Sequence, residues 1–356
     1  MKLTYEIRTL HTKHTFTISR GGASSWRVVT VTLTDEDGVF GIGEAAPSRF
    51  YGETPETVIA ALEQFRPLLE SIDPWCMETI EEEMHRALRG NSAAKSAASA
   101  ALHDLAGKRL GLPVYRLWGL DPSRAPHSSF TIGVAPEPEL RLKVREAAAY
   151  PILKVKLGTD RDAEILRVIR EEAPDKVLRV DANAAWTARQ ALAMMDVLAE
   201  HRVEFVEQPL APHDFRGLRF VRERATLPII ADESCVFFSD VARMADAVDG
   251  INIKLAKCGG LREAVKMIIA ARANGLLVMM GCMIESSLGI TAASHMAPLL
   301  DFADLDGAAL LADDPYTGAT IERGVIAIPR EPGLGVTPAV RAAAEPSARG
   351  LRARAG

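Results

Sequence analysis

The sequence has few cysteines, and none of them forms a CxxC pair. Cys76, Cys235, Cys258 and Cys282 are scattered along the 356 residues. This spacing argues against a disulfide framework and against a zinc site, so it favours a reducing compartment. The first ten residues, MKLTYEIRTL, mix charged and apolar side chains and contain no apolar stretch of a secretory signal. We therefore expect a cytoplasmic protein.

Long hydrophobic runs and an excess of basic residues are also missing. The longest apolar run, at 276–284, is too short to cross a bilayer, so no membrane partner is expected. The formal net charge of −5 gives no reason to expect nucleic acid. No GxGxxG motif occurs, which removes the usual sign of an open dinucleotide-binding sheet. With 48% hydrophobic residues, the chain is typical of a folded protein with a large core.

Two regions of different pattern precede residue 126. Residues 1–46 contain β-branched runs and an Asp-Gly turn, which predict antiparallel strands. Residues 54–110 predict helices, since Thr54 followed by proline is a typical helix start and Gly111 follows as a stop signal.

After residue 126, short β-rich runs alternate with amphipathic helical segments. The predicted strands lie at 128–134, 152–157, 177–183, 204–209, 227–233, 250–255, 275–281 and 302–307. Eight strands separated by helical segments predict an α/β protein with a parallel sheet closed into a (β/α) barrel. Residues 320–335 again predict short strands, and 337–356, rich in alanine and arginine, predict a disordered tail.

Charged residues fall near the carboxyl ends of five consecutive predicted strands. They are Lys156, Asp181, Glu207, Asp232 and Lys254, and each follows the previous one by 22 to 26 residues, about one βα unit. In a barrel, this spacing places all five side chains on the rim where active sites of this fold lie. A charge in a strand that is buried on both faces is unfavourable unless it has a function or a partner.

Three converging carboxylates would repel one another unless a cation lay between them. Mg²⁺ takes oxygen ligands in octahedral geometry, and Asp181, Glu207 and Asp232 would fill about half of its shell. The metal would hold a substrate carboxylate and stabilise an enolate. Lys156 and Lys254 would then remove and return the α-proton, with a pKa lowered by the nearby positive charge of the metal and of Lys154.

Several segments carry a resemblance to a known family. They are GIGEAAPSRFYGET (41–54), LKVKLG (153–158), RVDANAAW (179–186), VEQPL (206–210), ADES (231–234), INIKLAKCGG (251–260) and DLDG (304–307). With them the sequence resembles the mandelate racemase-like branch of the enolase superfamily and, within it, the dipeptide epimerases of the L-Ala-D/L-Glu type. The Asp304-x-Asp306 pair is the feature that points to dipeptides.

The resemblance implies a modified (β/α)₇β TIM-like barrel over residues 121–310. An α+β capping domain would be formed by residues 1–120 together with the returning segment 311–336. The resemblance also implies one Mg²⁺ per active site, held by the three carboxylates, with Lys156 and Lys254 as the acid and base.

The same resemblance implies the substrate site of an isomerase that inverts the C-terminal residue of a dipeptide such as L-Ala-L-Glu by 1,1-proton transfer. The implied substrate-binding residues are Arg20, Thr131, Lys154, Cys282, Ile284, Asp304 and Asp306. The last two would bind the α-ammonium group, since a free amine in a closed site needs a carboxylate partner. Arg20 would favour an acidic second residue. Asn183 and Glu233, next to the ligands, would support the metal site from outside its shell.

Other functions stay open at this point. An N-acylamino-acid racemase, an o-succinylbenzoate synthase or a muconate-type cycloisomerase would have no use for Asp304 and Asp306. A dipeptide epimerase with hydrophobic or cationic specificity would keep this pair and differ at Arg20. A non-catalytic metal-binding scaffold would lack one of the five rim charges, and all are present. The expected partner is a small-molecule dipeptide, and assembly into a homo-oligomer is an open expectation.

Overall fold

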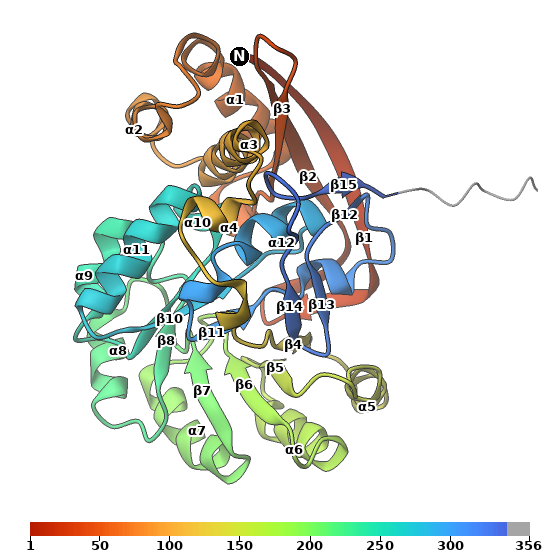
Figure 1. Cartoon of the computed structure of the whole chain (residues 1–356). Helices are drawn as coiled ribbons and strands as arrows, with labels where there is room; N and C mark the ends of the chain where they lie inside the picture. Colours follow the sequence, from red (N-terminus) through yellow and green to blue (C-terminus); the bar gives the residue numbers. More distant parts are fainter. Residues whose placement is uncertain (340–356) are drawn as a thin grey trace, which may run out of the picture.

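The structure, a computed structural model, describes residues 1–339, with an N-terminal α+β region above a barrel (Figure 1). Strands β1 (Lys2–Ile18), β2 (Gly21–Thr34) and β3 (Phe40–Ala45) form an antiparallel sheet in the order β1-β2-β3. The predicted Asp-Gly turn joins β2 to β3, and Gly38 has a φ of 82° there, which favours glycine. The prediction of antiparallel strands in this region is confirmed.

Three helices follow this sheet. They are α1 (Pro55–Ser71), α2 (Met77–Ala87) and α3 (Ser92–Leu110). Helices α1 and α3 pack on the sheet, and α2 packs on α1 and α3. The Thr54 side chain accepts a hydrogen bond from the Thr57 backbone and caps α1 as predicted, while Gly111 ends α3 in the left-handed region. Helix α3 is alanine-rich and packs closely on β3, where a Cβ added at Gly43 would lie 2.1 Å from the carbonyl oxygen of Ala97. Glycine is therefore required at this crossing.

Eight parallel strands form the barrel, which confirms the predicted fold class. They are β4 (Phe130–Ile132), β5 (Ile152–Lys156), β6 (Val177–Asp181), β7 (Val203–Glu207), β8 (Ile229–Ala231), β9 (Gly250–Ile253), β10 (Leu277–Gly281) and β11 (Phe302–Asp304). Neighbours in the sheet follow chain order from β4 to β11. The first and last strands meet through a bridge between Ser128 and Ala303, and the Ser129 N–H donates to the Ala303 carbonyl at 3.0 Å. We call this junction the seam.

Helices follow the strands in the (β/α)₇β order. They are α5 (Glu137–Glu146), α6 (Asp162–Glu172), α7 (Ala188–Glu200), α8 (Phe215–Arg222), α9 (Phe238–Met244), α10 (Leu255–Cys258), α11 (Leu261–Ala273) and α12 (Ser287–Ser294). Short helical turns complete the chain: η1 (Arg49–Tyr51), α4 (Val114–Leu117), η2 (Pro122–Arg124), η3 (Ala297–Leu299) and η4 (Gly307–Leu310).

Alternate residues along the strands point into the barrel, because side chains of a strand alternate between its two faces. Phe205, Ile230 and Met279 form a buried cluster. Each lies two residues before the rim position that follows on its strand. The Arg179 guanidinium stacks beside Phe205, 5.3 Å from its ring centre. This filled interior is the floor beneath the rim charges.

The C-terminal segment packs back against both parts of the molecule. It contains β12 (Tyr316–Thr317), β13 (Thr320–Glu322), β14 (Val325–Ala327) and β15 (Thr337–Pro338). Tyr316 contacts the Thr30 hydroxyl of β2 at 3.2 Å, and the Leu334 N–H donates to Asp104 of α3 at 2.7 Å.

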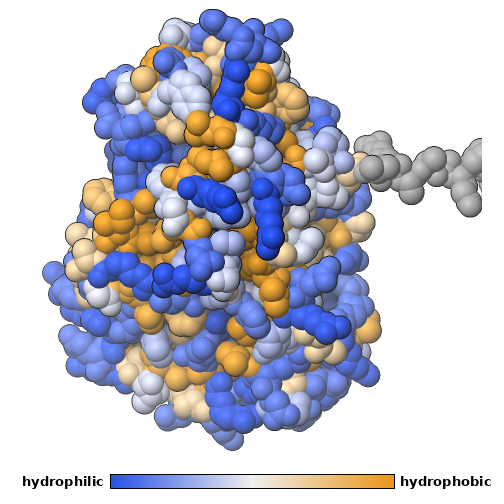
Figure 2. Space-filling model, in the orientation of Figure 1, coloured by the Kyte–Doolittle hydropathy of each residue, from blue (hydrophilic) through white to orange (hydrophobic). Residues whose placement is uncertain are grey.

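The tail predicted at 337–356 needs one correction, because Thr337 and Pro338 pair with β12 through backbone contacts that leave no hydrophobic pattern in the sequence. The rest of that prediction, 340–356, lies outside the described residues. Hydrophilic side chains cover most of the face in Figure 2, with apolar patches between them. Among residues 1–339, no helix is long and apolar enough to cross a membrane.

Candidate active site

The five predicted rim charges lie together at the carboxyl end of the barrel. Lys156, Asp181 and Glu207 are register partners on neighbouring strands β5, β6 and β7. Asp232 and Lys254 come directly after β8 and β9. The three carboxylates are buried and offer oxygen atoms that all lie within 4.8 Å of one another. Strand register, which aligns equivalent positions of parallel strands, is therefore what assembles this cluster.

Each carboxylate has an oxygen within 2.8 Å of one of the lysines predicted from the sequence. Lys156 Nζ lies 2.6 Å from Asp181 Oδ2, and Lys254 Nζ lies 2.8 Å from Asp232 Oδ2. These two lysines occupy opposite flanks of the carboxylate cluster, since β6, β7 and β8 separate the strands that carry them. The fully buried Lys154, also on β5, lies 2.7 Å from Glu207 Oε2.

The protonation of the cluster follows from burial and from these contacts. Burial and the negative charge of Asp181 raise the pKa of Glu207. Burial opposes ionisation of Asp232 too, but the ammonium groups of Lys254 and Lys257 outweigh it and hold its pKa below the usual range. Burial also disfavours the charged form of Lys254, yet Asp232 outweighs that effect and raises its pKa. This direction is opposite to the predicted lowering, which assumed the positive charge of a bound cation beside the lysine.

The donor set fits a hard divalent cation. All three groups are oxygen donors, as Mg²⁺ prefers. Glu207 Oε2 is buried, and although it lies 2.7 Å from Lys154 Nζ, no residue of the described range 1–339 meets it in hydrogen-bond geometry. The Lys154 ammonium compensates part of the charge of this oxygen, and a divalent cation would add the direct ligand contact that it lacks.

Three side chains that the sequence reasoning missed also contact the cluster. Asn252 Nδ2 donates to Glu207 Oε1 at 2.7 Å, and Gln208 Oε1 accepts the Asp232 N–H at 2.9 Å. Lys257, in α10, donates to Asp232 Oδ1 and to its carbonyl oxygen. Each is a buried polar residue within five residues of a predicted rim charge, and this proximity is the signal in the sequence that could have found them.

Asn183 and Glu233 lie beside the carboxylates, as predicted. Asn183 adopts a left-handed conformation, with a φ of 46°, so its N–H reaches Asp181 Oδ1 at 2.8 Å and its Nδ2 reaches Oδ2 at 3.2 Å. Arg20, at the β1–β2 turn, donates to the Asn183 carbonyl at 2.6 Å and to Glu233 at 2.8 Å. Its guanidinium also lies 4.3 Å over the Phe50 ring. Arg20 thus connects the capping region to the barrel rim.

A second pair of carboxylates lies next to the seam. Asp304 accepts hydrogen bonds from Ser129 at 2.6 Å and from Lys154 at 2.7 Å. Asp306 accepts the Thr131 N–H at 2.6 Å, and burial together with the charge on Asp304 raises its pKa to about 7. The Cys282 thiol donates to the Asp304 carbonyl at 3.3 Å, and burial raises its pKa, so it is a neutral thiol.

One cavity of about 730 Å³ connects both groups of residues. Its barrel side includes Lys154, Lys156, Lys254 and both carboxylates of the second pair, and Ile284 lies at its edge. Its other side comes from the capping region and includes Arg20, Arg49 and Trp26. All the substrate-binding residues predicted from the sequence therefore line one space, which lies between the two parts of the molecule.

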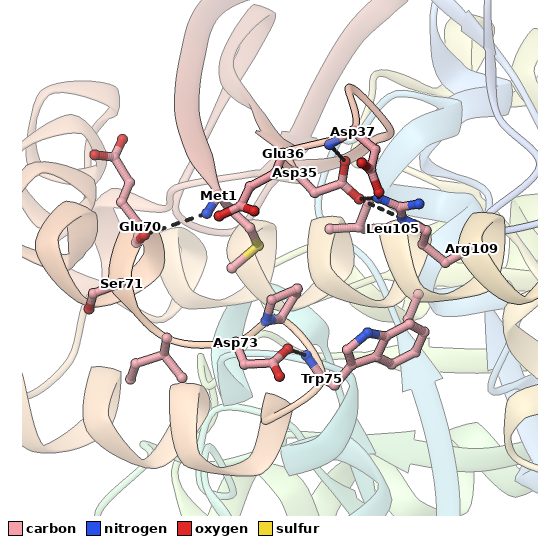
Figure 3. Close-up of a pocket in the computed structure, with 13 residues that line it drawn as sticks. Met1, Asp35, Glu36, Asp37, Glu70, Ser71, Asp73, Trp75, Leu105 and Arg109 are labelled. Atoms are coloured by element: carbon pink, nitrogen blue, oxygen red, sulfur yellow. Dashed lines mark hydrogen bonds and ion pairs between the residues drawn. The ribbon is translucent and has the colours of Figure 1, made fainter.

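Another cavity, of about 630 Å³, lies in the capping region away from this chemistry (Figure 3). Its lining includes the exposed Trp75 and several carboxylates. Arg109 donates to Asp35 and to Asp37, each at 2.6 Å, at the cavity rim. Exposed ion pairs of this kind contribute little energy, and none of the predicted site residues lies there.

Comparisons with known proteins agree with this geometry. A mandelate racemase/muconate lactonizing enzyme N-terminal domain model matches residues 3–119, and an enolase C-terminal domain-like model matches 139–343. L-Ala-D/L-Glu epimerase of Bacteroides thetaiotaomicron is 40% identical over 94% of this chain and 88% of its own length. Hydrophobic dipeptide epimerase of Roseobacter litoralis is 38% identical over 94% of this chain and 98% of its own.

A solved structure is similarly close. Dipeptide epimerase from Enterococcus faecalis, complexed with Mg and L-Leu-L-Tyr, superposes with a TM-score of 0.90 at 34% identity. The match covers 94% of this chain and 99% of that one.

Proposed function

Because the chain belongs to the mandelate racemase/muconate lactonizing enzyme family of the enolase superfamily, we propose that it is a Mg²⁺-dependent dipeptide epimerase. The observation that carries the proposal is the pair of lysines, Lys156 and Lys254, on opposite flanks of three buried carboxylates. Two bases facing each other across a bound substrate are what inversion at a carbon atom requires.

Asp181, Glu207 and Asp232 would hold the cation. When bound, it supplies positive charge beside the substrate carboxylate, which lowers the free energy of the negative charge that develops as the α-proton leaves. Lys154 adds a second positive charge, since its buried ammonium lies within 2.7 Å of both Glu207 and Asp304. It would polarise the same carboxylate.

Proton transfer is assigned to the two flanking lysines. One removes the α-proton from one face of the substrate, and the ammonium group of the other donates a proton to the opposite face. Because each lysine can act first, the reaction runs in both directions between the L and D forms. Closure of the β1–β2 turn over the barrel, held by Arg20 on Glu233, would exclude water from the exchanging protons.

Asp304 and Asp306 would bind the α-ammonium of the N-terminal residue. A substrate ammonium beside Asp306 stabilises its ionised form, which replaces an unfavourable contact between two carboxylates with an ion pair. N-Acyl substrates have no positive charge to offer there, so this pair favours dipeptides over the N-acylamino-acid alternative. Relatives named as L-Ala-D/L-Glu and as hydrophobic dipeptide epimerases share the dipeptide class.

For the second residue, we propose an acidic side chain such as glutamate. Arg20 and Arg49 both line the cavity from the capping region, and guanidinium groups bind carboxylates through paired hydrogen bonds. In this structure Arg20 is engaged by Glu233, so a substrate carboxylate would have to share or displace that contact. Hydrophobic specificity remains the competing hypothesis.

Deuterium exchange tests the proposal. In D₂O with Mg²⁺, L-Ala-L-Glu should lose its C-terminal α-proton signal in NMR and convert to the L,D form. The N-acetylated dipeptide is the matched control and should exchange far more slowly, and EDTA should stop both reactions. Absence of exchange across a library of free dipeptides would reject the proposed function, and equal exchange of the acetylated compound would favour an N-acylamino-acid racemase.

We also propose a location, a domain division and an oligomeric state for the protein. Cytoplasmic location is inferred from the scattered cysteines. Division of the chain near residues 120 and 310, and assembly into a homo-oligomer, are likewise proposals. Size-exclusion chromatography with light scattering tests the last of them.

A further inference from the structure

Each carboxylate of the proposed metal site has at least one oxygen held by a neighbouring polar residue, and in Asp181 the Asn183 amide also reaches the second. The Asn183 N–H holds Asp181 Oδ1 at 2.8 Å, and Asn252 Nδ2 holds Glu207 Oε1 at 2.7 Å. The Lys257 ammonium holds Asp232 Oδ1. None of the three predicted ligands therefore has both oxygens free.

The second oxygen of each carboxylate faces a lysine of the cavity instead. The pairs are Lys156 with Asp181, Lys154 with Glu207 and Lys254 with Asp232, at 2.6, 2.7 and 2.8 Å. In Glu207 and Asp232, one oxygen is held by a residue that does not line the cavity, Asn252 or Lys257, and the other contacts a lysine that does. A cation in the cavity would meet a single oxygen from each.

Lys257 is the most firmly fixed of the three holding groups. Only 1% of its surface is exposed, and its ammonium also donates to the carbonyl oxygens of Asp232 and Asn252, at 2.7 and 2.9 Å. A buried ammonium with this many acceptors has no alternative position of similar energy. It belongs to the barrel wall and does not line the cavity.

We propose that Lys257 and Asn252 are positioning residues that keep Asp232 and Glu207 monodentate, so that the site selects Mg²⁺ over Ca²⁺. Mg²⁺ takes a compact octahedral shell, whereas Ca²⁺ takes six to eight oxygens and readily uses both oxygens of a carboxylate. A carboxylate oxygen that is already held by Lys257 or Asn252 is not available as the additional ligand that Ca²⁺ would use. The inference rests on the proposed function, since it concerns the same metal site.

The test compares the two ions on the same protein. Isothermal titration calorimetry gives the Kd of Mg²⁺ and of Ca²⁺ for the wild type, Lys257→Met and Asn252→Leu. Removing a positive charge changes the affinity of both divalent ions alike, so the ratio of the two Kd values isolates the positioning effect. We expect the preference for Mg²⁺ to fall roughly tenfold or more in each variant, the size typical of groups that orient metal ligands.

Lys95→Met is the matched control, because Lys95 is equally buried and donates to the Leu88 carbonyl, away from the carboxylates. It should lose stability and keep the wild-type ion preference. If Lys257→Met does not fold, Asn252→Leu decides, because it leaves the charge of the site unchanged. A crystal structure of the wild type with Ca²⁺ needs no variant, and it should show Asp232 bound through Oδ2 alone.

The outcomes separate the two proposals. If the wild type binds Mg²⁺ and both variants keep the wild-type preference, the positioning role is wrong and the proposed function stands. Asp232 chelating Ca²⁺ through both oxygens in the wild type would overturn it in the same way. If the wild type binds neither ion, both the proposed function and this inference fall.

Discussion

Replacing Asp306 with asparagine should make the protein more stable and a poorer enzyme. Asp306 is buried, and its pKa is raised to about 7 by burial and by the charge on Asp304. Asparagine has nearly the same shape, and its amide oxygen can still accept the Thr131 N–H. The substitution therefore removes an unfavourable charge with little change in packing.

The sign and size of the stability effect follow from the raised pKa. Between pH 3.8, the ordinary value, and about 7, the folded protein keeps a proton that the unfolded chain has lost. Stability therefore falls as pH rises through this window, because the folded state binds more protons. Above this pH window, the loss in the free energy of unfolding is on the order of 4 kcal/mol. Asp306→Asn has no such loss. The difference between its free energy of unfolding and that of the wild type should therefore grow from near zero at pH 4 toward that value at pH 8.

The functional effect has the opposite sign. A hydrogen bond to a charged group contributes about 1.5–3 kcal/mol, so losing one carboxylate at the ammonium should lower kcat/KM for L-Ala-L-Glu roughly 10- to 150-fold. The residual rate with the N-acetylated dipeptide should hardly change, since that substrate has no ammonium group.

Thermal unfolding from pH 5 to 8 in EDTA, together with NMR exchange rates, measures both effects. Asp121→Asn is the control, because Asp121 is exposed and its pKa is lowered by hydrogen bonds from Ser123, so the variant should gain nothing at high pH. A variant at Asp306 with a wild-type Tm at pH 8 would refute the argument from burial. A wild-type kcat/KM would refute the assignment of the ammonium site.

Three further predictions concern the lysines, the metal and the capping region. Lys156→Ala and Lys254→Ala should each slow exchange from one stereoisomer by at least about 100-fold while dipeptide binding persists; an unchanged NMR rate removes that lysine from the mechanism. Asp232→Asn should abolish the rise in Tm that Mg²⁺ gives the wild type, as measured by differential scanning fluorimetry, and a full rise contradicts its role as ligand. Gly43→Ala, whose Cβ would lie 2.1 Å from the Ala97 carbonyl oxygen, should cost about 1–3 kcal/mol of stability, and an unchanged Tm would show that α3 can shift.

The barrel could be predicted from the sequence because each strand carries its own local signal. A buried parallel strand is a short apolar run, and a charge directly after it stands out against that run, as at Asp232 and Lys254. Equal spacing then places these charges on one rim without any knowledge of contacts. All eight predicted strand positions are confirmed.

The contacts that orient the carboxylates could not be predicted in this way. Asn252 reaches Glu207 across 45 residues, and Lys257 reaches Asp232 across 25, through the register of separate strands and the path of α10. Local pattern does not determine such pairings. The engagement of Arg20 by Glu233 likewise depends on how the capping region sits on the barrel. Short backbone pairings such as β12 with β15 also leave no pattern in the sequence from which they could be predicted.

The seam of the barrel determines when substrate recognition can appear during folding. Ser129 is synthesised early, but its partners Ala303 and Asp304 follow 174 and 175 residues later. A chain that has emerged only as far as β10 already contains the proposed metal ligands and both proposed catalytic lysines, but it lacks Asp304 and Asp306. Such long-range contacts form late, because closing a long loop is entropically unfavourable. Completing the barrel therefore also completes the proposed ammonium site, because Ser129 and Asp304 meet at the seam.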